Sequence, residues 1–190
     1  MRQFECMRIF FVIALISGPA WAEDCPEPRD SSTELDALIA SARAASSAID
    51  AKDVTSGMWD VWLRAPNDQA QEVLDRGLAR RDGYDFAGAY NDFDKLVEYC
   101  PNYAEGFNQR AFVQFLRGEY AGALVDLDAA LALLPNHVAA QSGRALTLMQ
   151  MGRLKEARAQ MLEALNNNPW LSERALIAKD APLGPIGEDI

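Results

Sequence analysis

The strongest constraint on the fold of this chain is a self-similarity that returns at one fixed spacing, the one that separates the prolines at positions 101, 135 and 169. An alanine and a second small residue recur at this same spacing, and bulky apolar residues stand at fixed distances from the alanine. The recurring residues are Pro101, Pro135 and Pro169; Ala89, Ala123 and Ala157; Gly77, Ala111 and Ala145; Phe93, Leu127 and Met161; and Phe86, Tyr120 and Leu154. A fixed period of this length indicates a solenoid of stacked supersecondary units.

Each unit is predicted to be two antiparallel helices joined by a short turn. The small residues let the paired helices approach closely, and the proline ends the second helix because it lacks an N–H and restricts the residue before it. Gly118 and Gly152 lie in the predicted turns of the second and third units, where the backbone needs a positive φ. In the first unit the glycine, Gly83, comes one place earlier.

This pattern resembles the tetratricopeptide repeat, whose unit combines a small residue in its first helix, A-x3-F and a closing proline. The resemblance covers residues 70 to 171, with repeats at 70–103, 104–137 and 138–171 in a region of 67–171. It departs from the family early in the unit, where only Phe107 is aromatic. It implies an all-α, tetratricopeptide-type helix-turn-helix solenoid, and the chain looks like an exported bacterial member with three full repeats.

Helical segments are predicted on both sides of the repeats. Residues 31–66 carry a capping-box pattern, Ser31 with Glu34, then apolar residues at helical spacing and a second helix from about 52 to 64. We interpret them as a degenerate terminal repeat that caps the stack. Residues 172–190 are expected to form a short capping helix and a mobile tail.

Residues 1–22 have the pattern of an export signal. Arg2 and Arg8 lie before an apolar run from Ile9 to Ile16, and Ala20-Trp21-Ala22 offers a cleavage site. This run is too short to cross a hydrocarbon core, which needs roughly 20 apolar residues. We expect cleavage, a mature chain without a membrane span, an arm at 23–30, and a periplasmic or extracellular location. A buried helix or an uncleaved anchor are the alternatives.

Two cysteines, Cys25 and Cys100, follow the predicted signal. In an oxidising compartment an even pair is most simply a disulfide, and two unrelated buried thiols are the alternative. The predicted bond would tie the polar, proline-rich arm to the corner where the first repeat ends.

Composition and motifs argue against several functions. The net charge is −10, and no basic run is longer than Arg80-Arg81, so nucleic acid is not an expected partner. The chain has one histidine, His137, and lacks phosphate-binding glycine loops and nucleophile motifs. We therefore predict no enzyme activity, no metal and no cofactor.

Three arginines, Arg76, Arg110 and Arg144, recur at the repeat spacing and should form a file along the stack. One interpretation is a ladder that binds an anionic partner. The other, which we favour, is pairing with acidic groups on neighbouring second helices, such as Asp92 and Asp126.

The family resemblance places an inner groove on the first helix of each repeat. The family's lysine and asparagine clamp for a peptide carboxylate is absent at the matching positions, so capture of chaperone C-terminal peptides is disfavoured. An amphipathic helix or extended segment of a partner could occupy the groove, with Phe112 and Phe115 as anchors, or the chain's own termini could fill it. The predicted groove residues are Leu74, Leu78, Glu105, Asn108, Phe112, Phe115, Leu146 and Met149.

These observations predict a non-catalytic module that binds a protein or peptide as an adaptor in the periplasm or cell envelope. The alternative is a self-assembling module whose groove or end faces pair with copies of the same chain.

Overall fold

The computed structural model describes residues 24–185, and the predicted signal lies outside them. The described residues form eight α-helices and one 3₁₀ helix, η1, with no strand among them. The bounds are α1 Ser32–Ala44, α2 Ala48–Trp62, α3 Asp68–Asp82, α4 Phe86–Tyr99, α5 Ala104–Leu116, α6 Tyr120–Leu133, α7 Val138–Gln150, α8 Leu154–Asn167 and η1 Ser172–Ile177. The predicted all-α repeat fold is confirmed.

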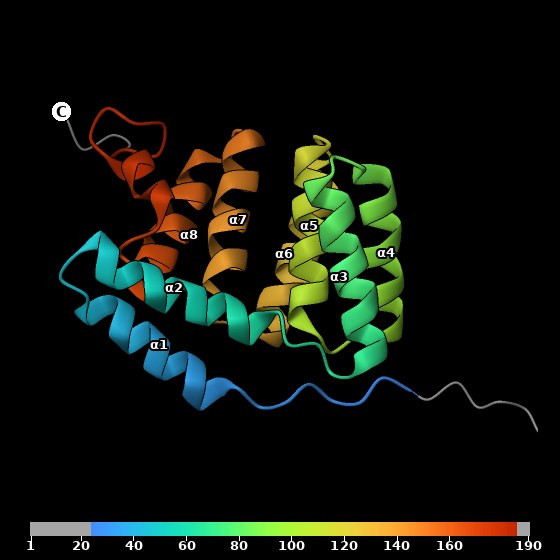
Figure 1. The fold of residues 1–190 in the computed structure, drawn as a ribbon. Coiled ribbons are helices and arrows are strands. Elements are labelled where there is room, and N and C mark those ends of the chain that lie inside the picture. Colours follow the sequence, from blue (N-terminus) through green and yellow to red (C-terminus); the bar gives the residue numbers. More distant parts are fainter. Residues whose placement is uncertain (1–23, 186–190) are drawn as a thin grey trace, which may run out of the picture.

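Helices α3 to α8 form three antiparallel pairs that stack side by side (Figure 1). The alanine shared by the three pairs, Ala89, Ala123 and Ala157, is fully buried in each of them. At Gly77 an added Cβ would clash with the Phe93 ring, so a larger residue there would force this buried ring to shift. The periodic small residues therefore set how closely the paired helices pack.

The turns inside the pairs share one backbone conformation at equivalent positions. Gly118 and Gly152 have φ values of 76° and 74°, and Tyr84, which stands one repeat before Gly118, has a φ of 63°. Gly83, expected to serve as the turn glycine of the first unit, has an ordinary φ of −82°. The stack thus imposes the left-handed conformation even on a tyrosine, a residue that adopts it at a cost.

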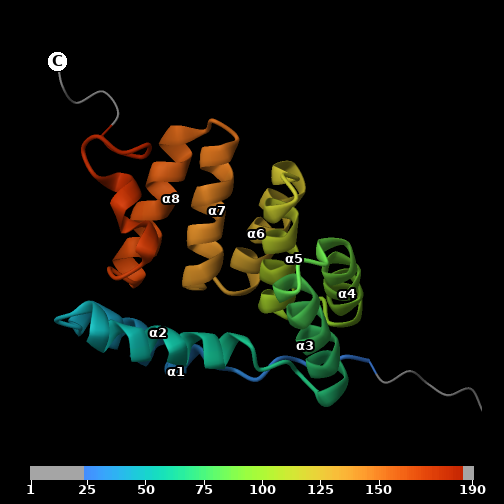
Figure 2. The same cartoon turned by 45° about the horizontal axis from the view of Figure 1, so that its top comes forward.

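The hairpin of α1 and α2 does not stack on α3 as a further repeat would. It lies across the N-terminal ends of α5 and α7 and extends to the C-terminal end of α8 (Figures 1 and 2). Arg43 donates to the carbonyl of Asn166 at 2.7 Å and to the side chain of Asn167 at 2.8 Å. The interpretation of 31–66 as a cap on the stack is therefore corrected.

Packing explains this placement. The apolar side of the hairpin meets Val138 at the start of α7 and Leu171 after α8, and its residues Met58 and Trp62 are fully or almost fully buried.

The predicted capping box at the start of α1 is wrong, because the Ser31 side chain makes no cap bond. Glu34 pairs instead with Arg64 at 2.6 Å, and that guanidinium lowers the pKa of Glu34.

The C-terminal segment is less free than the sequence indicated. The capping helix is the short η1, and Leu183 beyond it is fully buried against the core of the third pair. Arg158 donates a hydrogen bond to the Leu183 carbonyl. The tail is therefore packed at least to Leu183.

Between residues 24 and 185 no helix is long and apolar enough to cross a membrane.

Candidate partner-binding groove

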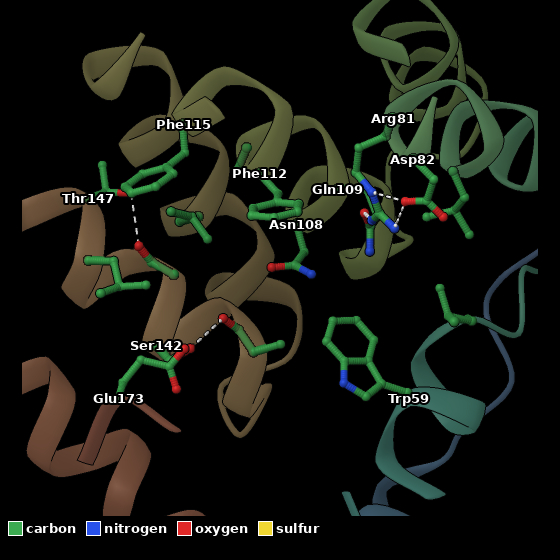
Figure 3. A pocket seen from close by; sticks show the side chains of 17 residues that line it. Trp59, Arg81, Asp82, Asn108, Gln109, Phe112, Phe115, Ser142, Thr147 and Glu173 are labelled. Atoms are coloured by element: carbon green, nitrogen blue, oxygen red, sulfur yellow. Dashed lines mark hydrogen bonds and ion pairs between the residues drawn. The ribbon is translucent and has the colours of Figure 1, made fainter. Parts of the chain in front are cut away.

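The first helices of the three pairs, α3, α5 and α7, line an inner groove that contains a cavity of about 560 Å³ (Figure 3). The α1–α2 hairpin closes the groove at the N-terminal end of these helices. Trp59 of α2 and Leu63, the residue after α2, form part of the cavity wall, and Glu173 of η1 borders it from the side of α8. The groove is thus partly occupied by the chain itself.

Aromatic and aliphatic side chains make most of the cavity wall. Phe112 and Phe115 project from α5, one turn apart, and Leu78 and Leu146 face them from α3 and α7. Phe112 is 45% exposed although it is a large apolar residue. An apolar surface that remains open inside a concave groove is typical of a binding site.

The polar groups of the wall are largely engaged with one another. Arg81 lies over the Phe112 ring, donates to the Gln109 carbonyl oxygen and pairs with Asp82 at 2.8 Å. Ser142 and Thr147 donate their hydroxyl hydrogens to carbonyls of their own helix. These two hydroxyl groups therefore face the cavity as hydrogen-bond acceptors, through the lone pairs of their oxygens.

A buried polar cluster, which we call the Glu105–His137 cluster, holds the hairpin against α5 and α7. His137 Nε2 lies 2.7 Å from the Glu105 carboxylate, and both side chains are inaccessible to solvent. His137 Nδ1 accepts the Ala140 N–H, so the ring hydrogen on Nε2 is the one directed at Glu105. The Trp62 ring stacks on His137 at 4.2 Å.

Tyr103 adds a second attachment between the hairpin and α5. Its hydroxyl donates to the Trp62 carbonyl at 2.6 Å, and its burial raises the pKa of the phenol far above its ordinary value. Tyr103 therefore stays a neutral donor. The end of α2 is held through the Trp62 backbone carbonyl as well as through the Trp62 ring, which stacks on His137.

The structure separates the predicted groove residues into two groups. Leu78, Asn108, Phe112, Phe115 and Leu146 line the cavity. The other three do not: Leu74 is fully buried in the core of the first pair, Glu105 belongs to the buried cluster, and Met149 packs against the core of the third pair. These three residues therefore lie outside the wall of this cavity.

Several wall residues were missed by the sequence analysis because nothing marked them. Trp59 and Leu63 lie outside the repeats, and Glu173 lies beyond them. For the Glu105–His137 cluster the sequence held one signal. His137 and Glu105 both stand at the start of a first helix, and these helix starts are the ends that meet the hairpin.

The arginine file pairs with acidic and amide groups at a fixed offset along the chain. Arg110 binds Asp126 through two nitrogens, at 2.8 and 2.6 Å, and Asp94 at 2.6 Å. Arg144 repeats this with Asp128 and Gln160, and Arg76 with Asp92. The hydrogen bonds that Arg110 donates to Asp126 raise the pKa of the guanidinium, so it is always charged. In this structure Arg110 and Arg144 each link two second helices, whereas Arg76 binds one.

Asp92 has a second cationic neighbour that its counterparts lack. Arg80 Nη1 lies 2.9 Å from its Oδ2 in an ion pair without hydrogen-bond geometry. The Asp92 residue is 1% exposed, so both arginines compensate a buried charge.

The structure joins Cys25 and Cys100, whose Cα atoms are 5.2 Å apart. The arm is also held by Asn102, which donates to Glu27 at 2.7 Å. This geometry is compatible with the predicted disulfide, and the bond in the native protein stays a prediction.

In the part of the chain that is described, no three His, Cys, Asp or Glu side chains form a group able to hold a metal ion.

Curated relatives contain the same repeat. A Nematostella vectensis homologue of tetratricopeptide repeat protein 36 is 36% identical over 72 residues, 38% of this chain and 40% of the relative. The Bos taurus protein of that name is 29% identical over 130 residues, 66% of this chain and 68% of its own. A Rhizobium etli repeat protein is 34% identical over 64 residues, 34% of this chain and 31% of its own. The chain spans less than half of the length of the first and last of these.

Solved structures agree in fold. The first TPR of Spaghetti, bound to an HSP90 peptide, superposes with a TM-score of 0.56 at 22% identity, over 57% of this chain and 87% of that one. The TPR2B domain of yeast Sti1, described as a complex with pHsp70, gives 0.54 at 19% identity, over 57% and 90%. The family profile described as "Tetratricopeptide repeat" matches residues 114–175. In sequence over these residues, and in fold, this chain is similar to the tetratricopeptide repeat family.

Proposed function

We propose that the chain is a non-catalytic module that binds another protein or a peptide in its inner groove. The observation that carries this proposal is the cavity at the centre of the groove, with Phe112 exposed and Phe115 half-buried in its wall. Large aromatics in a concave, desolvated site contribute most of the binding energy of protein interfaces. The fold supports the proposal, because two of its structural neighbours are described with bound partners, an HSP90 peptide and pHsp70.

The hairpin limits what the groove can accept. Since α2 closes one end and Trp59 enters the cavity, an occupant lies beside α2 and inserts side chains between α3, α5 and α7. A helix is about 10–12 Å across with its side chains, so it would have to share the groove with the hairpin. A short extended segment fits the site better.

We further propose that the protein acts as an adaptor in the periplasm or cell envelope. The pattern of residues 1–22 and the proximity of Cys25 to Cys100 support export. Fractionation of source cells, with N-terminal sequencing of the recovered protein, tests this step. A cytoplasmic chain that still begins at Met1 would contradict it.

Loss of partner capture in a groove variant tests the binding function. Phe112→Ser with Phe115→Ser should weaken cross-linked capture from the envelope fraction at least about tenfold, because both anchors are removed. The matched control replaces two exposed apolar residues of second helices, Val125→Ser with Leu162→Ser. Equal capture by the groove variant and the control, with helicity intact in both, would refute the groove.

A further inference from the structure

We propose that the groove recognises a short segment in which a lysine or arginine stands beside apolar side chains. This inference rests on the proposed function and specifies the chemistry of its partner. It follows from the charges, the hydrogen-bonding groups and the aromatic rings of the cavity wall.

The charged groups of the wall leave an excess of negative charge. Among the described residues that line the cavity, Arg81 is the only cation, and Asp82 and Gln109 already engage it. Glu173, half-buried at the opposite side, accepts a hydrogen bond from Ser172 and forms no ion pair within residues 24–185. A carboxylate in this position attracts a cation on the occupant.

The uncharged polar groups of the wall are mainly hydrogen-bond acceptors. Asn108 uses its amide nitrogen on Glu105, which leaves its carbonyl oxygen at the cavity (Figure 3). Ser142 and Thr147 spend their hydrogens on helix carbonyls. An ammonium or guanidinium group has only donors, so it matches this wall, whereas a carboxylate finds few partners in it.

The aromatic rings supply the third feature. Trp59, Phe112 and Phe115 surround the cavity, and the faces of such rings attract cations. Arg81 already lies 5.5 Å from the centre of the Phe112 ring, which shows that this wall accommodates a guanidinium. The same rings pack against the aliphatic stem of a lysine or arginine and against a neighbouring leucine.

Selection from a random peptide library on the oxidised, full-length protein tests the proposal. We expect enriched peptides to combine lysine or arginine with large apolar residues. In an enriched peptide, replacing the cation with norleucine should weaken binding several-fold, replacing it with glutamate should weaken it further, and added salt should weaken the parent peptide most.

Variants of the protein show where the peptide binds. Glu173→Gln should weaken the parent peptide about threefold, as expected for one partly exposed charge at roughly 6 Å. Glu98→Gln, on the exposed side of α4, makes the same change in net charge away from the groove and should have no effect. Phe112→Ser with Phe115→Ser should abolish binding.

The outcomes separate the two proposals. Enriched peptides that are neutral or acidic, yet lose binding in the Phe112 and Phe115 variant, would overturn the charge inference and leave the groove function standing. Basic peptides equally sensitive to Glu98→Gln and Glu173→Gln, and insensitive to the loss of both phenylalanines, would show general attraction to an acidic surface and overturn both. Absence of any enriched peptide would also overturn both.

Discussion

Arg110 should contribute much more to stability than its repeat equivalents Arg76 and Arg144. Its side chain is 16% exposed, and it compensates Asp126, whose side chain is 5% exposed. In Arg110→Ala, Asp126 would keep only the Gln114 amide as a partner. Removing one member of a buried ion pair costs about 3–5 kcal/mol, because the remaining charge stays buried without compensation.

The two equivalent arginines serve as internal controls. Arg144 pairs with the exposed Asp128 and with the neutral Gln160, so Arg144→Ala should cost about 1 kcal/mol. In Arg76→Ala the buried Asp92 keeps Arg80 at 2.9 Å, so we expect about 1–2 kcal/mol. The differences among the three variants therefore come from their partners and not from the repeat position.

Urea unfolding followed by far-ultraviolet circular dichroism, on oxidised protein, measures these free energies. Asp126→Asn in the Arg110→Ala background should recover part of the loss, since it removes the uncompensated charge. Equal losses at positions 76, 110 and 144, or no recovery in the double variant, would refute this account of the arginine file.

Four further outcomes are expected. Ala123→Leu should cost about 1–3 kcal/mol by overpacking a site with no exposed surface, and an unchanged melting temperature would contradict the alignment of the repeats. Gly118→Ala and Gly152→Ala should each cost about 1 kcal/mol at their positive φ, whereas Tyr84→Ala, which keeps an L-residue there, should be close to neutral by thermal denaturation. His137→Ala should lower the free energy of unfolding by about 1.5–3 kcal/mol, because it removes a hydrogen bond to buried Glu105. Amide hydrogen exchange should then speed up more in α2 than in α4. An equal increase in both helices would argue against the cluster as the attachment of the hairpin. Intact mass with and without reduction should differ by two hydrogen atoms if Cys25 and Cys100 are bonded, and two freely alkylated thiols in unreduced material would exclude the bond.

The repeat fold could be predicted because its determinants are local and periodic. Alanine at the helix contact and proline at the corner each report a packing constraint that returns in every unit. The left-handed turn shows where this reasoning stops. Residue type pointed to Gly83, but the position in the stack decides the backbone conformation, and Tyr84 adopts it.

The placement of the hairpin and the part of the cavity wall outside the repeats could not be predicted, because they depend on contacts between distant parts of the chain. Arg43 of α1 binds the Asn166 carbonyl at the end of α8, and Trp62 stacks on His137. No period relates these residues, so their partners are set by which apolar surfaces meet in three dimensions. Phe112 and Phe115 could be assigned to the groove from the sequence because their part of the cavity wall belongs to the repeats.

The position of the α1–α2 hairpin has a mechanical consequence. A stack of repeats is a bent elastic rod, whose arc widens or tightens through small rotations summed over successive units. The hairpin spans this arc as a strut, attached near the start of α5 through Tyr103 and Trp62 and at the end of α8 through Arg43. Bending the rod would break one of these attachments, so the array behaves as a braced frame of fixed span and not as an open spring.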